Sequence, residues 1–147
     1  MLLITHGNTP VTEPIWGVLT GSRNPREVLR SVFGHTSHTE FRTGQILNGE
    51  DVIAVIPTGR GKTVVYVLPC IMKPGLAVVI SPLMMLMCDQ VARLQGYGIN
   101  TCYYNTLLSD SERRNILHNL KQPNCQYQLV FLSPEAVIRQ FRKLLSH

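Results

Sequence analysis

Two glycines, a lysine and a threonine lie close together in the segment PTGRGKT, and their spacing is suited to holding phosphate groups. Gly59 and Gly61 allow positive φ angles, so that backbone N–H groups can turn toward an anion. Lys62 has the reach for the β- and γ-phosphates of a nucleotide, and the hydroxyl of Thr63 is a suitable ligand for Mg²⁺. The segment therefore predicts a phosphate-binding loop, although the strict pattern GxxxxGK(S/T) begins with Gly where this chain has Ile56.

Two later turns share one design. Ser81-Pro82 and Ser133-Pro134 each follow a buried apolar run and precede a helical pattern. Serine suits the N-cap and proline the first helical position, and the free N–H groups of such a turn point outward. Because the carboxyl ends of parallel strands lie along one edge, we expect both turns and the phosphate loop at that edge. Either several phosphates bind there or the turns are only well-capped helix starts, and spacing alone favours the second interpretation.

Strands and helices alternate along most of the chain. Continuous β-branched runs indicate buried strands, whereas apolar periodicity and capping signals indicate helices. The expected strands are residues 52–56, 76–80, 101–104 and 129–132, and the expected helices are residues 62–72, residues 81–96, one starting at the capping box Ser109-Asp110-Ser111-Glu112 and one starting at Ser133. This order predicts an α/β fold with a parallel sheet and right-handed crossovers.

The part before the phosphate loop divides into two segments. Residues 1–24 show no hydrophobic period and predict an irregular tail. Residues 25–50 predict a helix that Asn24 caps and Gly34 ends, followed by a loop. The α/β domain itself is expected over residues 51–147.

Composition narrows the class of protein. The net charge of +5 and the pI of about 9.3 suit a polyanionic partner without demonstrating one. The longest apolar run, residues 64–72, is far shorter than the ~20 residues that cross a bilayer. The four cysteines show no CxxC spacing and the histidines are scattered singly, so we expect reduced thiols and no zinc site. The sequence starts with the apolar residues Met-Leu-Leu-Ile and has no basic residue before them. This disfavours a secretory signal and indicates an intracellular protein.

Methionines and tyrosines in two of these elements have a simpler interpretation. Met84, Met85 and Met87 share a predicted helix, where core packing is the expected role. Tyr103 and Tyr104 are neighbours on a predicted strand, so alternation predicts that one of them faces the core.

Taken together, these stretches resemble the first motor domain of the RecQ family of ATP-dependent DNA helicases from about Pro25 onward. Phe33-Gly34 followed by Phe41-Arg42-Thr43-Gly44-Gln45 resembles the adenine-recognition motif. Residues 56–63 resemble motif I, in which a bulky apolar residue also stands first. The stretch SPLMMLMCDQV, residues 81–91, resembles motif Ia, and residues 132–135 resemble the weaker motif Ib. The resemblance implies a RecA-like P-loop NTPase sheet of helicase superfamily 2, incomplete at the C-terminus.

The resemblance also implies a function, cofactors and contacts. It implies 3′-to-5′ unwinding of DNA driven by ATP with Mg²⁺, in the nucleus of a eukaryote or the cytoplasm of another cell. Nucleotide contacts are implied for Arg42 and Gln45 on adenine, for Lys62 and Thr63 on phosphate and Mg²⁺, and for Thr58, Gly59, Arg60 and Gly61 in the loop. DNA-backbone contacts are implied for Ser81, Pro82, Asp89, Gln90, Ser133, Pro134 and Glu135. No membrane partner and no zinc are expected in this segment.

The chain also departs from the family pattern. It contains no Asp-Glu dipeptide, so the family's Mg²⁺-binding DEAH-type box is missing, and so is the second motor lobe. Only residues 46–50 separate Gln45 from Asp51, where the family has a longer helix. We therefore expect a helicase fragment that is inactive alone. Two alternatives remain open, a small P-loop kinase and a non-catalytic module that binds nucleotide or DNA.

Overall fold

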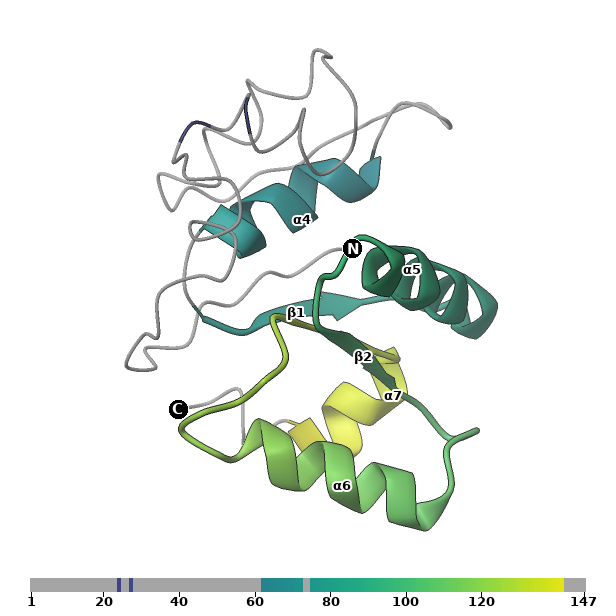
Figure 1. Ribbon diagram of the computed structural model, residues 1–147. Coiled ribbons are helices and arrows are strands. Elements are labelled where there is room, and N and C mark those ends of the chain that lie inside the picture. Colours follow the sequence, from purple (N-terminus) through teal and green to yellow (C-terminus); the bar gives the residue numbers. More distant parts are fainter. Residues whose placement is uncertain (1–23, 25–26, 28–61, 73–74, 142–147) are drawn as a thin grey trace. The chain divides into compact units, whose positions relative to one another are not determined.

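The computed structural model describes residues 24, 27, 62–72 and 75–141. The chain divides into two compact units, residues 11–74 and residues 75–147 with residues 1–10. Each unit is considered by itself (Figure 1). The predicted strand at residues 52–56, the tail at residues 1–23 and most of the helix predicted after Asn24 lie outside the described residues. At the start of that helix, the N–H of Glu27 donates to the carbonyl of Asn24 at 3.1 Å.

The larger unit contains a parallel sheet of three strands. They are β1 (Ala77–Ile80), β2 (Thr101–Tyr104) and β3 (Leu129–Leu132), in the spatial order β1-β3-β2. The central strand β3 is buried along its whole length, as a continuous apolar run requires when both faces of a sheet are covered. Three predicted strands are thereby confirmed, although the first begins at residue 77 and not at 76.

Helices cover both faces of this sheet (Figure 1). Helix α5 (Met84–Gly96) lies on one face, where the Thr101 hydroxyl donates to the carbonyl of Val91 at 3.5 Å. On the other face, residues of the strands and Ala136 of helix α7 (Pro134–Ala136) form one buried cluster, and apolar residues of helix α6 (Asp110–Leu120) pack against it. The members of this cluster are Val78, Cys102, Tyr104, Val130, Leu132 and Ala136, with Ile116, Leu117 and Leu120 of α6 packed against it. The predicted α/β architecture is confirmed for the described residues.

Helix α6 begins where the sequence predicted. Ser109 is the N-cap, its hydroxyl oxygen accepts from the N–H of Glu112 at 3.3 Å, and the Glu112 carboxylate accepts from the N–H of Ser109 at 2.8 Å. Both halves of the capping box are therefore formed, and each satisfies a backbone donor that the first helical turn leaves without a partner.

Of the other two helices in this unit, α5 starts later than predicted, whereas the helix after β3 starts at Ser133 as predicted. Helix α5 begins at Met84 with Leu83 as its N-cap, so the prediction that Ser81 caps this helix is wrong. The Ser81 N–H donates to the carbonyl of Leu132 at 3.0 Å, because the backbone of β1 continues its pairing with β3 past Ile80. The helix after Ser133 is α-helical for only three residues and continues as a π-helix, η1 (Val137–Phe141).

Helix α4 (Lys62–Met72) belongs to the smaller unit and confirms the helix predicted for these residues. Valines are poor helix formers, but residues 65–71 are all buried, and burial of an apolar face outweighs such a weak propensity. The Cys70 thiol donates to the carbonyl of Tyr66, and burial raises the pKa of both side chains to about 12. None of the helices in the described part of the chain is long and apolar enough to cross a membrane.

Candidate functional site

The amino end of α4 carries the two side chains expected to hold phosphate and Mg²⁺. Lys62 is the first residue of the helix and is exposed, and Thr63 follows it half-buried. The first turn of α4 contains no acidic residue. The partial positive charge of the helix amino end therefore reinforces the lysine ammonium, an arrangement that attracts anions.

The rest of the predicted nucleotide site lies outside the described residues. This applies to Arg42, Gln45, Thr58, Gly59, Arg60 and Gly61. Thr63 is thus the described residue expected to contact Mg²⁺, and its hydroxyl oxygen is the ligand type that this ion prefers. In the described part of the chain, no group of three His, Cys, Asp or Glu side chains is arranged to hold a metal ion. Thr63 therefore fits Mg²⁺ as one ligand among others, with phosphate oxygens and water completing the shell.

The register of the sheet brings two of the predicted DNA-contacting residues together. Ile80 and Tyr104 are both paired with Leu132, so the residues that follow these strands form one row at the carboxyl edge of the sheet. Ser81 and Ser133 are neighbours in this row. The expectation that both turns share an edge is confirmed.

Ser133 is held in place as a helix cap, whereas Ser81 is not. The Ser133 hydroxyl accepts from the N–H of Ala136 at 3.3 Å, and Pro134 occupies the first helical position as predicted. Ser133 is only 6% exposed, so its hydroxyl serves the helix first. The side chain of Glu135, two residues further on, is exposed.

The other predicted DNA-contacting residues are less close to the edge. Asp89 is exposed and Gln90 half-buried, five and six residues after the start of α5, so they lie ~7.5–9 Å along its axis. Pro82 is exposed in the segment between β1 and α5. Motif Ia therefore spreads from the edge along the helix, and only its first residues lie in the row of Ser81 and Ser133.

Methionines at the start of α5 correct a further expectation. Met87 is fully buried, but Met85 is 75% exposed and Met84 and Leu86 are also exposed, together with Leu83. The prediction of core packing is right for Met87 and wrong for Met84 and Met85. As expected, one tyrosine of the pair on β2 is in the core, since Tyr104 is 3% exposed and Tyr103 is half-buried.

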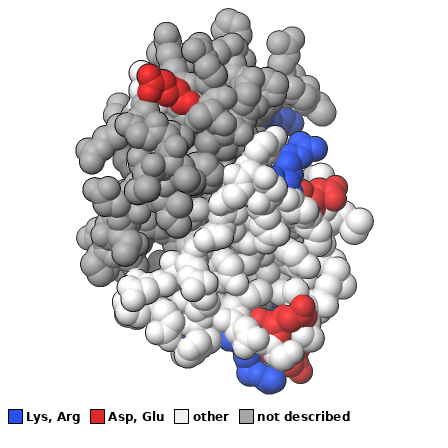
Figure 2. Space-filling view, viewed as in Figure 1, with Lys and Arg blue, Asp and Glu red and all other residues white. Residues whose placement is uncertain are grey.

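Figure 2 shows a group of charged side chains at the bottom of the view, separated by neutral surface from the charged side chains further up. The lower group lies over the start of α6, where Arg113 donates to the carboxylate of Asp110. This guanidinium holds the pKa of Asp110 below its usual value, and hydrogen bonds from Ser109 do the same for Glu112. Arg93 and Arg139, the cations expected to help bind DNA, are exposed on α5 and η1. With few cations in the row itself, backbone N–H groups are its main donors.

Sequence analysis overlooked one residue of the row. Asn105 directly follows β2 and is 1% exposed, and its position beside Ser133 follows from the pairing of Tyr104 with Leu132. A polar residue at the carboxyl end of a parallel strand is the signal that would have found it.

The sequence profile of the DEAD/DEAH box helicase family matches residues 42–147. This match covers more than half of the chain, which therefore belongs to that family. The parallel sheet with helices on both faces agrees with the RecA-like P-loop NTPase fold that the motifs predicted.

Curated relatives refine this assignment. The chain is 39% identical over 127 residues to the ATP-dependent DNA helicase RecQ of Haemophilus influenzae, covering 82% of this chain and 20% of that protein. It is 38% identical over 119 residues to the probable ATP-dependent DNA helicase RecS of Bacillus subtilis, covering 76% and 23%. It is 36% identical over 108 residues to the RecQ-like DNA helicase BLM of Xenopus laevis, covering 69% and 8%. The resemblance to RecQ helicases is confirmed, and the chain spans less than a quarter of the length of these relatives.

Proposed function

We propose that this chain is the ATP-binding part of a 3′-to-5′ DNA helicase similar to RecQ. ATP binds at the amino end of α4, and the DNA backbone contacts the carboxyl edge of the sheet. Lys62 contacts the β- and γ-phosphates, Thr63 is a ligand of Mg²⁺, and residues 58–61 surround the phosphates with backbone N–H groups. Arg42 and Gln45 contact the adenine base.

One observation carries the nucleotide part of this proposal. An exposed lysine and a threonine open an 11-residue helix whose first turn has no acidic residue. A polyanion is attracted to such a helix end both by the ammonium group and by unpaired N–H groups. The names of the relatives, which are ATP-dependent DNA helicases, support ATP as the anion.

The DNA part of the proposal is supported by the row at the sheet edge. Ser81 and Ser133 lie side by side there, and the start of α5 is close in sequence to the first of them. Backbone N–H groups contact phosphate and carry no sequence information, so binding is sequence-independent. Pro82, Asp89, Gln90, Pro134 and Glu135 line the two turns and the helix that follows.

The isolated chain is proposed to neither hydrolyse ATP nor separate strands. Phosphoryl transfer requires carboxylates that place Mg²⁺ and an oriented water, and the sequence contains no Asp-Glu pair of the family type. A duplex with a 3′ tail, incubated with the purified chain and ATP, is expected to stay double-stranded. Strand separation that disappears in Lys62→Ala would contradict this part of the proposal.

The decisive experiment for nucleotide binding is a titration of the chain with fluorescent ATP in the presence of Mg²⁺. Lys62→Ala is expected to weaken binding at least about tenfold, the scale of one hydrogen bond to a charged group. Because Lys62 is exposed, its removal is expected to change the free energy of unfolding by no more than about 0.5 kcal/mol.

The matched control is Lys121→Ala, which removes another exposed lysine, at the C-cap of α6. It lowers the net charge by the same amount and is expected to leave ATP affinity unchanged. Equal affinities of the two variants would overturn the assignment of Lys62.

A further inference from the structure

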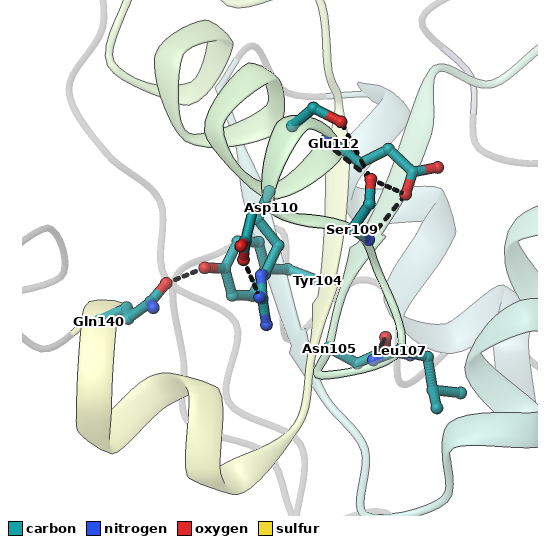
Figure 3. A network of polar contacts seen from close by, with 9 residues as sticks. Tyr104, Asn105, Leu107, Ser109, Asp110, Glu112 and Gln140 are labelled. Carbon is teal, nitrogen blue, oxygen red and sulfur yellow. Dashed lines mark hydrogen bonds and ion pairs between the residues drawn. The ribbon is translucent and has the colours of Figure 1, made fainter.

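Asn105 has a buried side-chain amide whose oxygen is hydrogen-bonded and whose nitrogen has no acceptor in the described part of the chain. Its Oδ1 atom accepts a hydrogen bond from the N–H of Leu107 at 2.9 Å, which closes a short turn after β2 (Figure 3). Its Nδ2 atom is buried and has no hydrogen-bond acceptor in the described part of the chain. A buried donor without an acceptor lowers the stability of the fold, so such a group calls for an explanation.

The contacts between β2 and α5 place Asn105 along the helix. Thr101 contacts the third and fourth turns of α5, since Gln95 Nε2 donates to its carbonyl at 3.0 Å and its hydroxyl donates to Val91. Tyr103 lies beside Cys88, whose proximity contributes with burial to raising the tyrosine pKa. Helix α5 is thus antiparallel to β2. Each advance of two residues along the strand corresponds to about one turn toward the amino end of the helix.

Continued one residue past the end of β2 at Tyr104, this geometry leads Asn105 toward the first turn of α5. Two further residues of a strand advance by ~6.6 Å, slightly more than one helical turn of ~5.4 Å, which leads from Cys88 to Met84. Alternation along β2 agrees, because Asn105 shares the side of Thr101 and Tyr103 and not that of Tyr104, which faces the α6 side.

The first backbone N–H groups of α5 also lack hydrogen-bond acceptors among the described residues. Its N-cap is Leu83, which provides no side-chain hydrogen bond, and its first turn has no acidic residue. The earliest helical N–H that finds a carbonyl in the described part of the chain is that of Met87, which donates to Leu83 at 3.2 Å. A helix amino end without a cap and a buried amide donor are thus adjacent, and both require an acceptor.

We propose that Asn105 and the first turn of α5 together form a subsite for one phosphate of the DNA backbone. The Nδ2 atom of Asn105 donates to a non-bridging phosphate oxygen, and the N–H groups of the helix start donate to the same phosphate. Asparagine side chains and helix amino ends are both common donors to DNA phosphates. The inference rests on the proposed binding of DNA at this edge and adds a positioning residue that neither of the two Ser-Pro turns contains.

Binding at this subsite requires a local movement, because Nδ2 has no exposed surface in the free chain. The next two residues in the chain are exposed, Leu107 to 70%, so their side chains can move while the hydrogen bond from the Leu107 N–H to Asn105 stays in place. Moving them sacrifices little buried apolar surface, and the new hydrogen bond to phosphate compensates for it.

The test compares Asn105→Ser and Asn105→Asp with the unmodified chain. Serine keeps an oxygen that can accept from the N–H two residues later, so the turn survives while the amide donor is lost. Aspartate keeps the turn and replaces the donor by an anion. Thr106→Asp, the matched control, adds the same charge at the adjacent exposed position and measures the general electrostatic effect.

Affinity for a fluorescent single-stranded oligonucleotide is measured by anisotropy at several salt concentrations. We expect Asn105→Ser to bind about tenfold more weakly, the loss for one hydrogen bond to a charged group. The slope of affinity against salt is expected to stay the same, because a neutral amide releases no counterion. Asn105→Asp is expected to bind at least tenfold more weakly than Thr106→Asp, and Asn105→Ser is expected to melt no lower than the unmodified chain.

Two results would overturn the inference in distinguishable ways. Unchanged affinity of Asn105→Ser with a lowered melting temperature would mean that the amide only supports the turn, while the proposed DNA-binding edge remains. If the unmodified chain binds no DNA at low salt, the proposed edge is wrong and the subsite falls with it.

Discussion

Replacing Ser133 by alanine tests whether the helix after β3 depends on a single capping bond. The Ser133 hydroxyl accepts from the N–H of Ala136 at 3.3 Å, at the start of an α-helical turn of only three residues. Loss of a serine N-cap costs ~0.5–2 kcal/mol. Ser133 is 6% and Ala136 9% exposed, so water is largely kept from the freed N–H. The expected loss for Ser133→Ala is therefore in the upper half of that range, about 1–2 kcal/mol.

Ser109→Ala is the matched comparison. It removes the same hydroxyl from the N-cap of α6, but this cap is exposed and water can replace the oxygen. The expected loss is about 0.5–1 kcal/mol, the lower half of the capping range. The two variants therefore differ in the exposure of the cap while sharing the chemical change.

Urea unfolding followed by circular dichroism measures both losses. In thermal unfolding, a loss of 1 kcal/mol lowers the melting temperature of a chain of this size by about 4 °C. Ser133→Ala is therefore expected to melt roughly 4–8 °C lower than the unmodified chain. If Ser133→Ala is no more destabilising than Ser109→Ala, burial of the cap is irrelevant and the reasoning is refuted. A loss of DNA affinity beyond the unfolded fraction would add a direct contact to the capping role.

Three further predictions concern the fold of the described residues. Hydrogen bonds from Ser109 lower the pKa of Glu112, so this carboxylate stabilises the fold fully above the ordinary Glu value of 4.5 and less as pH falls through its lowered pKa. The stability difference between the unmodified chain and Glu112→Gln should therefore be present at pH 7 and shrink as pH falls through the lowered pKa of Glu112, and a constant difference would contradict a contribution from the carboxylate charge. Phe131 is a fully buried residue of the central strand, so Phe131→Ala is expected to lower the free energy of unfolding by ~3–5 kcal/mol in urea. A loss below ~1 kcal/mol would show that neighbouring side chains fill the space left by the ring. Burial raises the pKa of the Cys70 and Cys102 thiols to about 12, so a thiol reagent at pH 8 should label the other two cysteines first, and a single fast phase for all four would disprove this.

Local signals in the sequence determined which segments are strands and helices. The apolar run of residues 129–132 is too short for a helix and is flanked by polar residues, which is why the strand was predicted within its observed bounds. The capping box at Ser109 has its own side-chain hydrogen bonds within one turn, so it forms without help from distant parts of the chain. Motif types and spacing likewise indicated the helicase family, which the comparisons confirm.

Only the tertiary structure decided the order of the strands and the surroundings of single residues. Strand β3, the last in sequence, lies between β1 and β2, and this order places Ser133 between Ser81 and Asn105. Pairing of the Ser81 N–H with Leu132 extends the backbone of β1 and delays the start of α5, which no local capping rule could foresee. The exposure of Met85 and the unpaired amide of Asn105 depend in the same way on which neighbours the fold brings beside them. Helix capping and strand propensity depend on a few neighbouring residues, so they can be predicted from the sequence. The burial of a side chain, and whether a buried polar group finds a hydrogen-bond partner, depend on contacts between residues far apart in the chain.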